Sequence, residues 1–107
     1  SMTLSNKPAE QEEQRYQLGF SREAQKEWKK LGKPIQLQFA LKLQERLKNP
    51  HIAKDALSGM LHCYKIKLRS IGFRLVYQVI DQALVVTVIA VGKRERNEVY
   101  RNARDRL

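Results

Sequence analysis

The side chains with the most chemical potential in this sequence are cations, and they gather in its second half. They stand on two closely spaced segments and comprise Lys65, Lys67, Arg69, Arg74, Lys93, Arg94 and Arg96. Lysines and arginines at such density can bind phosphate groups and can stabilise negative charge that develops on one. The alternative is a strand surface that long cationic side chains merely keep solvated. The residues alone leave these two interpretations open.

Other kinds of reactive centre have weak signals. A ribonuclease with two histidines needs one imidazole as base and one as acid, but His51 falls in a predicted linker and His62 at the edge of a predicted strand. We expect Glu95 and Glu98 to pair with nearby arginines rather than to act as catalysts. Cys63 is the only cysteine, and no carboxylate cluster, phosphate loop or nucleophile elbow is present. We therefore expect neither a metal site nor a cofactor.

Composition points to one basic domain. The chain has 107 residues, with 21 lysines and arginines against 11 acids, a formal net charge of +10 that favours a polyanionic partner such as nucleic acid. No apolar run approaches the ~20 residues of a membrane helix, so we expect a cytoplasmic protein that does not enter a membrane. Ser1-Met2 resembles the scar of a removed expression tag, and polar residues 3–14 predict a flexible tail. Residues 15–107 are expected to form the single domain.

The first half of that domain predicts one strand and two helices. Residues 16–20 alternate as in a short strand, and Ser21 can cap a helix whose apolar stripe is Ala24, Trp28 and Leu31. Gly32 is expected to end this helix, and Pro34 to open the next at its first position. The second helix has apolar residues every fourth position until Asn49-Pro50: Ile35, Phe39, Leu43 and Leu47. Their short connection predicts a helical hairpin packed on a sheet.

The second half changes to the period of a strand. Residues 64–69 and 73–80 alternate around a turn signal at 70–72, and residues 84–91 are nearly all apolar, as in an inner strand covered on both faces. Helical spacing returns in Val99, Ala103 and Leu107. The predicted fold is α+β with the order β-α-α-β-β-β-α: a mainly antiparallel sheet, a helical hairpin on one face and a C-terminal helix.

The first hairpin of the sheet has a predictable parity. The alternating apolar residues of both strands can share one face only if the connecting loop has an even length. A two-residue Ile71-Gly72 loop, with Gly72 in a type II turn, would meet this requirement. Lys67 would then face Val76, Arg69 would face Arg74, and Lys65 would face Gln78. The cations would form a row on the open face of the sheet, opposite the helical hairpin.

Three segments closely resemble the RelE toxins of bacterial toxin–antitoxin systems, within the RelE/ParE superfamily. They are CYKIKLRS at 63–70, GFRLVYQVID at 72–81 and VGKRER at 91–96, the last followed by Glu98-Val99-Tyr100. Weaker similarity runs through Phe20, residues 26–28 and 30–32, and residues 57–60. The resemblance covers residues 16–107, nearly the whole predicted domain. It implies a RelE-like fold.

The resemblance also implies an activity, that of a ribosome-dependent endoribonuclease. Such a toxin enters the ribosomal A site and cleaves mRNA within the codon by attack of a 2′-hydroxyl on the adjacent phosphate, which inhibits translation. Carried over by position, the catalytic residues are Lys65, Lys67, Arg74, Arg94 and Tyr100. The further cations Arg69, Lys93 and Arg96 are expected to bind RNA or the ribosome.

Each implied catalytic residue suits a role. Crowding by other cations lowers the pKa of a lysine, so Lys67 could accept the 2′-proton. Lys65 and Arg74 would stabilise the phosphorane, and Arg94 would stabilise the leaving oxygen. Tyr100 would stack on a splayed base and set the in-line angle; otherwise it is a helix residue packed on the sheet.

The resemblance implies partners as well. An acidic RelB-like antitoxin would restrain the toxin, and contact with operator DNA would occur only through the antitoxin complex. We expect the C-terminal helix to dock weakly, through Val99, Ala103 and Leu107, with Arg106 among the arginines that face water, so an antitoxin could displace it. Two alternatives remain: a ParE-like toxin that inhibits DNA gyrase, against which both lysines, Arg94 and Tyr100 argue, and a non-catalytic module that binds RNA or the ribosome.

Overall fold

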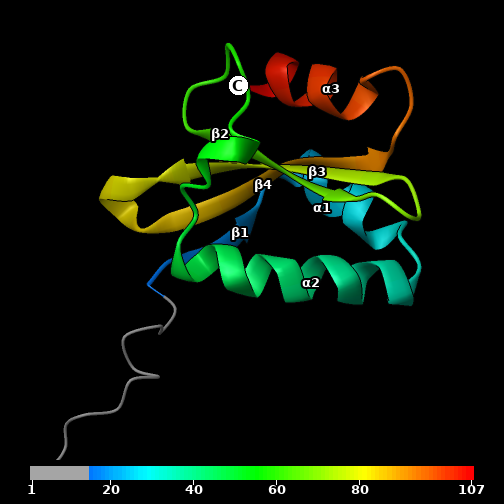
Figure 1. The fold of residues 1–107 in the computed structure, drawn as a ribbon, viewed down its shortest axis with the longest axis horizontal. Coiled ribbons are helices and arrows are strands. Elements are labelled where there is room, and N and C mark those ends of the chain that lie inside the picture. Colours follow the sequence, from blue (N-terminus) through cyan, green and yellow to red (C-terminus); the bar gives the residue numbers. More distant parts are fainter. Residues whose placement is uncertain (1–14) are drawn as a thin grey trace, which may run out of the picture.

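Between residues 15 and 107, three α-helices pack on one four-stranded sheet in an α+β arrangement (Figure 1). The computed structural model describes residues 15–107, so the predicted tag scar and tail at 1–14 lie outside the described residues. The elements are β1 (Gln17–Phe20), α1 (Arg22–Lys29), α2 (Lys33–Lys48), η2 (Ala53–Asp55), β2 (Cys63–Leu68), β3 (Phe73–Ile80), η3 (Asp81–Ala83), β4 (Val85–Lys93) and α3 (Glu98–Arg106). The sheet order is β1-β4-β3-β2, with β1 parallel to β4 and the other pairs antiparallel. The predicted element order and fold class are confirmed.

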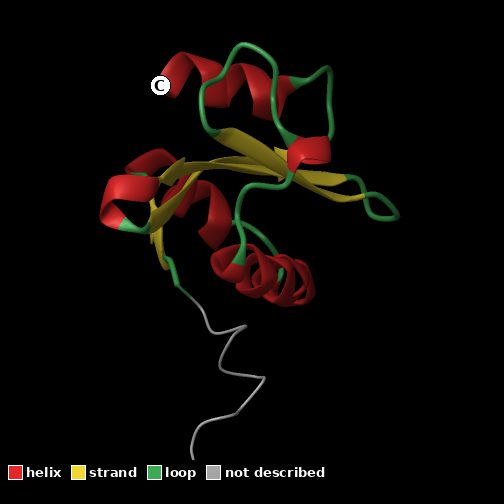
Figure 2. Cartoon of the chain, turned by 60° about the vertical axis from the view of Figure 1, so that its left-hand side comes forward, coloured by secondary structure: helices red, strands yellow, loops and turns green. Residues whose placement is uncertain are grey.

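Two helices cover one face of the sheet and form the larger core. In both views α1 and α2 lie on the same side, with α3 on the other (Figures 1 and 2). The helices contribute Ala24, Phe39, Leu43 and Leu47, and the sheet contributes Ile66, Leu68, Leu75, Tyr77, Val79, Val86, Val88 and Val91. The apolar stripes predicted from periodicity are therefore buried against the predicted faces of the strands.

Local signals set most helix ends, with small differences from the prediction. The Ser21 side chain accepts a hydrogen bond from the Ala24 N–H at 3.1 Å and so caps α1 as predicted. The helix ends at Lys29, before Gly32, because Lys30 already closes its last turn. Gly32 instead precedes α2, which begins one residue before Pro34. Asn49-Pro50 ends α2 as predicted.

The opposite face of the sheet is less open than predicted. Residues 57–60 and α3 cover part of it and form a second, smaller core of Met60, Cys63, Val76, Ile89, Ala90, Val99 and Ala103. Consequently β4 is covered on both faces, as its apolar sequence predicted. Only the end of this face near the β2–β3 turn remains available to the cationic residues.

The anchoring of α3 corrects the sequence prediction. Val99 and Ala103 are buried, but Leu107 is 52% exposed and does not complete the stripe. Arg106, which was expected to face water, instead donates to both carboxylate oxygens of Glu27, at 3.0 and 2.9 Å, and to the Ile89 carbonyl at 2.9 Å. Glu27 also accepts the Val91 N–H at 3.1 Å. A polar contact with α1 and β4 therefore replaces the predicted apolar contact.

The register of the first hairpin also differs from the prediction. The connection has four residues, 69–72, rather than two, because the Gly72 N–H donates to the Leu68 carbonyl and β2 stops there. Gly72 has the positive φ, +71°, that was predicted for it. Because four is also an even number, each side chain lies on the face of the sheet that was predicted for it. Its partner on the opposite strand, however, is two residues away from the predicted one. Lys65 lies opposite Val76, Cys63 opposite Gln78, and Lys67 opposite Arg74.

Within residues 15–107, no helix has the length and apolar character needed to cross a lipid bilayer.

The contact between Glu27 and Arg106 generates a prediction about α3. We expect Glu27→Ala to lower the free energy of unfolding by about 1.5–3 kcal/mol, the range for hydrogen bonds to charged groups, and to accelerate hydrogen exchange in α3. Gln25→Ala, an exposed position on α1, is the matched control. Equal exchange rates in α3 for the two variants would show that Val99 and Ala103 suffice to anchor the helix.

Candidate active site

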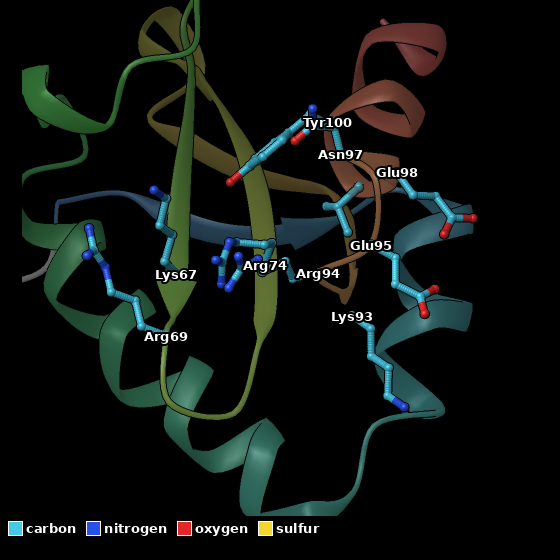
Figure 3. A pocket seen from close by; sticks show the side chains of 10 residues that line it. Lys67, Arg69, Arg74, Lys93, Arg94, Glu95, Asn97, Glu98 and Tyr100 are labelled. Carbon is cyan, nitrogen blue, oxygen red and sulfur yellow. The ribbon is translucent and has the colours of Figure 1, made fainter.

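Most of the predicted site residues meet in one cleft of about 400 Å³. We call it the cationic cleft; it lies between the β2–β3 hairpin, the end of β4 and the start of α3 (Figure 3). Its lining residues are Lys67, Arg69, Arg74, Lys93, Arg94, Glu95, Asn97, Glu98, Val99 and Tyr100. Two predicted residues lie outside: Lys65 does not line the cleft, and Arg96 lines a neighbouring hollow with Glu95, Glu98 and Arg101.

Sheet pairing brings the cations together. Lys67 on β2 lies directly opposite Arg74 on β3, and Arg74 in turn lies opposite Gly92 on β4. The Arg94 N–H donates to the Gly72 carbonyl at 2.7 Å, which ties the segment after β4 to the hairpin turn. Like charges directly across an antiparallel pair destabilise it. The repulsion between Lys67 and Arg74 therefore lowers the stability of the fold, and functional sites often carry such a cost.

A strained turn places Tyr100 beside these cations. Arg96 and Asn97 are both left-handed, with φ of 48° and 60°, between β4 and α3. Such a conformation costs free energy for residues other than glycine, and it is held by hydrogen bonds from Glu98 N–H to the Glu95 carbonyl and from the Arg101 guanidinium to the Arg96 carbonyl. The turn directs the first turn of α3 over the sheet, so that the Tyr100 ring reaches the cleft (Figure 3).

Arg74 is the one charged side chain that is buried among the described residues, at 8% exposure. Its guanidinium donates to the neighbouring Phe73 carbonyl at 3.0 Å, and no carboxylate between residues 15 and 107 pairs with it. A buried cation without a counterion is costly unless a ligand supplies the negative charge. Arg74 is therefore prepared for an anion.

Lys67 has the electrostatic surroundings predicted for it. The positive charge of Lys65 lowers the pKa of Lys67 most, followed by desolvation and by the charges of Arg69 and Arg74. The carboxylate of Asp55 opposes them and raises the pKa of Lys67. Lys65 thus acts on the cleft through its charge although it does not line it.

The Tyr100 hydroxyl lies beside the Arg74 guanidinium at the cleft. Its oxygen is buried yet has no hydrogen-bond partner among the described residues. Burial raises the pKa of Tyr100, while the nearby Arg74 guanidinium opposes this rise. The phenol is therefore neutral near pH 7 and can donate a hydrogen bond.

Among residues 15–107, no acid or histidine forms an ion pair with a cation of this cleft. The prediction that Glu95 and Glu98 pair with arginines is wrong, since neither forms an ion pair within the described chain and both carboxylates point away from Lys67 and Tyr100 (Figure 3). His51 contacts Tyr64 and Asp81, at 3.0 and 2.9 Å, and lies outside the cleft. In residues 15–107 no group of three potential metal ligands occurs.

Sequence reasoning missed Asn97 as a lining residue of the cleft. Its side chain makes no capping hydrogen bond to α3, which leaves the amide available as donor and acceptor. The available signal was the preference of asparagine for the left-handed conformation, but no pattern indicated that the turn at 96–97 would adopt it.

The two most enclosed arginines of the domain allow a matched stability test. Arg74 has no counterion, whereas Arg46 donates to Asp55 at 2.7 Å and to the Tyr77 hydroxyl at 2.8 Å. We expect Arg74→Met to leave the free energy of unfolding unchanged or to raise it by up to about 1 kcal/mol, because it removes a repulsive cross-strand pair. Arg46→Met should lower it by about 1.5–3 kcal/mol. Chemical denaturation measures both. A loss above about 1 kcal/mol in Arg74→Met, more than that repulsive pair contributes, would make Arg74 a structural residue.

Comparison with known proteins identifies the family. A family model described as the ParE toxin of the type II toxin–antitoxin system parDE matches residues 18–98. The mRNA interferase toxin RelE of Escherichia coli strain K12 is 56% identical over 92 residues, which are 86% of this chain and 97% of that protein. The mRNA interferase RelE of Shigella flexneri matches with the same identity and coverage.

Solved structures give the same relationship. A double arginine-to-alanine mutant of E. coli toxin RelE in the free state superposes with a TM-score of 0.80 at 54% identity, covering 86% of this chain and 97% of that one. The toxin of the intact E. coli RelBE toxin–antitoxin complex gives 0.73 at 57% identity, covering 76% and 99%. The family model spans most of the domain and the relatives are covered almost end to end, so this chain belongs to the RelE toxins of the RelE/ParE superfamily.

Proposed function

We propose that this protein is the toxin of a toxin–antitoxin system and an endoribonuclease that cleaves mRNA in the ribosomal A site, which inhibits translation. The observation that carries the proposal is the direct opposition of Lys67 and Arg74 in the cationic cleft. A buried arginine without a counterion is suited to a phosphate, and the lysine beside it has a lowered pKa. The names of the close relatives, mRNA interferase RelE, support the same reaction.

The proposed reaction is an internal transfer of the phosphate. The 2′-oxygen of one nucleotide attacks the adjacent phosphorus and gives its proton to the neutral Nζ of Lys67. The bond from phosphorus to the 5′-oxygen of the next nucleotide breaks, and that oxygen takes up a proton from water; the hydroxide left behind is neutralised by the proton that Lys67 later releases. The products are a 2′,3′-cyclic phosphate and a free 5′-hydroxyl.

Arginines provide the charge that this reaction requires. Arg74 and Lys65 stabilise the extra negative charge of the phosphorane, which exists only in the transition state. Arg94 stabilises the leaving oxygen, because a guanidinium gives up a proton with difficulty. Arg69, Lys93 and Arg96 are exposed and suit contacts with RNA phosphates.

Tyr100 supplies orientation. Its ring can stack on a base that is splayed from the message, and its hydroxyl can hold the phosphate. In-line attack requires the 2′-oxygen and the leaving oxygen on opposite sides of phosphorus. A flexible RNA must be held in this geometry, and we infer that the ribosome presents the mRNA in it.

An antitoxin partner follows from the family, since solved structures contain RelE relatives bound to RelB. We propose an acidic antitoxin that covers the cationic cleft, with operator DNA bound only through that complex. The displacement of α3 by such an antitoxin stays a prediction, in which the antitoxin must break the contact between Arg106 and Glu27. Because the substrate is translated mRNA, we place the activity in the cytoplasm.

Two other functions are weaker candidates. A ParE-like inhibitor of gyrase would fit the matching family model, but it would not require a lysine of lowered pKa beside a buried arginine. A non-catalytic module that binds RNA or the ribosome would explain the cations, but the names of the close relatives, mRNA interferase RelE, favour an enzyme.

Cleavage in the presence and absence of ribosomes distinguishes these functions. Primer extension on a translated mRNA should give cuts that are phased with codons, and the same RNA without ribosomes should stay intact at equal protein concentration. Efficient cleavage of naked RNA would remove the role of the ribosome. If neither RNA is cut while DNA supercoiling by gyrase is inhibited, the alternative toxin class is correct.

The proposed base makes a prediction about pH. Lys67 must be neutral to accept a proton, so the single-turnover rate should rise with pH until it levels off near the pKa of Lys67, which neighbouring cations lower. Lys67→Ala should cost about 10²- to 10⁴-fold in rate and should abolish this rise. Arg69→Ala, which keeps Lys67, is the control and should retain the rise. A variant at position 67 that keeps the wild-type pH dependence would place the base elsewhere.

A further inference from the structure

Arg46 of α2 reaches around the edge of the sheet to the strand that carries the proposed catalytic lysines. Its Nη1 donates to the Tyr77 hydroxyl at 2.8 Å and to the Lys65 main-chain carbonyl at 3.3 Å, and its Nη2 donates to Asp55 Oδ2 at 2.7 Å. The guanidinium also lies 5.6 Å from the centre of the Tyr77 ring. One side chain therefore joins α2, β2, β3 and η2.

The contact with Lys65 satisfies the free edge of β2. This strand is the last of the sheet, so alternate carbonyl groups point away from β3 and need other partners. Cys63 finds one in the Leu57 N–H at 3.0 Å, and Lys65 finds one in Arg46. The position of the Lys65 backbone, two residues before Lys67, thus depends on Arg46.

The contact with Asp55 fixes a negative charge near the cleft. Asp55 lies on η2, which packs against β2, and its charge raises the pKa of Lys67, Tyr77 and Tyr100. The side chains of Arg46 and Asp55 are only 14% and 18% exposed, so solvent screens their pair weakly. Without Arg46, Asp55 would lose its ion-pair partner, and Lys67 is a cation on which the charge of Asp55 already acts.

We propose that Arg46 is a positioning residue for the catalytic lysines: it holds the edge of β2 and keeps the Asp55 carboxylate from pairing with Lys65 or Lys67. This inference rests on the proposed function for its catalytic consequence, but the placement of Asp55 does not. It adds a residue on the helical side of the sheet to a site on the opposite face.

The charged groups around Lys67 determine the direction of the effect. Lys65 on the same strand, Arg69 in the turn and Arg74 on β3 are cations, and Asp55 on η2 is the acid that acts on Lys67. From the α3 side the cleft presents Arg94 and Tyr100, with the Glu95 and Glu98 carboxylates directed away. Release of Asp55 toward the lysines adds a closer negative charge, and this favours the protonated, inactive form of Lys67.

A set of three variants tests the inference. Arg46→Met frees Asp55 and should raise the pKa of Lys67, whereas Asp55→Asn removes the opposing charge and should lower it. The double variant should resemble Asp55→Asn, because without the carboxylate nothing remains to be released. Lys48→Met is the matched control at the same end of the helix, since Lys48 pairs with Glu45 and not with Asp55. This variant should leave the pKa of Lys67 unchanged.

Two measurements keep this test apart from that of the proposed function. NMR titration of isotopically labelled lysine side chains gives the pKa of Lys67 without any substrate, and single-turnover cleavage on ribosomes gives the pH–rate profile. The profile should move to higher pH in Arg46→Met and to lower pH in the double variant, as in Asp55→Asn. If Arg46 had a purely structural role, Arg46→Met and the double variant would both cleave more slowly, and neither would show a shifted pH–rate profile.

Each outcome decides one of the two ideas. A pKa of Lys67 that is unchanged or lowered in Arg46→Met overturns the inference, even if wild-type protein cleaves mRNA. Shifts of the expected signs support the placement of Asp55 even if wild-type protein cleaves nothing, in which case the proposed function fails instead. If Arg46→Met does not fold, Asp55→Asn decides: an unchanged or raised pKa of Lys67 overturns the inference.

Discussion

The opposition of Lys67 and Arg74 across the β2–β3 hairpin is the constraint on which the rest of the structure depends. Two cations at adjacent positions repel each other, so the strands that carry them must be held together by other contacts. The larger core provides these contacts, because Ile66, Leu68 and Leu75 on the same strands face α1 and α2. The period of two in a strand thus separates the two tasks: one face of the hairpin stabilises the fold, and the other concentrates charge.

The face of the sheet that carries the cations is only partly covered by α3 and residues 57–60. A sheet face covered over its whole length would bury the cations without counterions, and a fully open one would screen them with water. Here the smaller core stops at Val99 and Gly92, where a Cβ on the glycine would lie 3.5 Å from the valine side chain. The helix therefore packs closely over the middle of the sheet and leaves the hairpin end to the cleft. Arg74 becomes buried while Lys67 stays half-exposed, and this difference suits an anion holder beside a proton acceptor.

The sequence predicted the fold through patterns that are local. Helix stripes such as Phe39 and Leu43, the alternation of β2 and β3, and the apolar run of β4 depend on short spacings, and the structure agrees with all of them. The hairpin register was predicted two residues away from its true position, because parity distinguishes odd from even loops but not a loop of two from a loop of four. That error hid the direct pairing of Lys67 with Arg74, although the family resemblance had already named both residues.

Contacts between distant residues could not be predicted in this way. The pairing of Arg106 with Glu27 joins residues 79 positions apart, and Arg46 reaches Tyr77 over 31 positions. Neither contact produces a periodic pattern in the sequence. A long cationic side chain is predicted to be solvent-exposed when its partner is not known. Yet these contacts hold the two elements that frame the cleft, since Glu27 secures α3 with Tyr100 and Arg46 secures the edge of β2 beside Lys65. In this protein the catalytic candidates could be found from short motifs, whereas the side chains that position them become visible only when the folded chain brings α1 to α3 and α2 to β2.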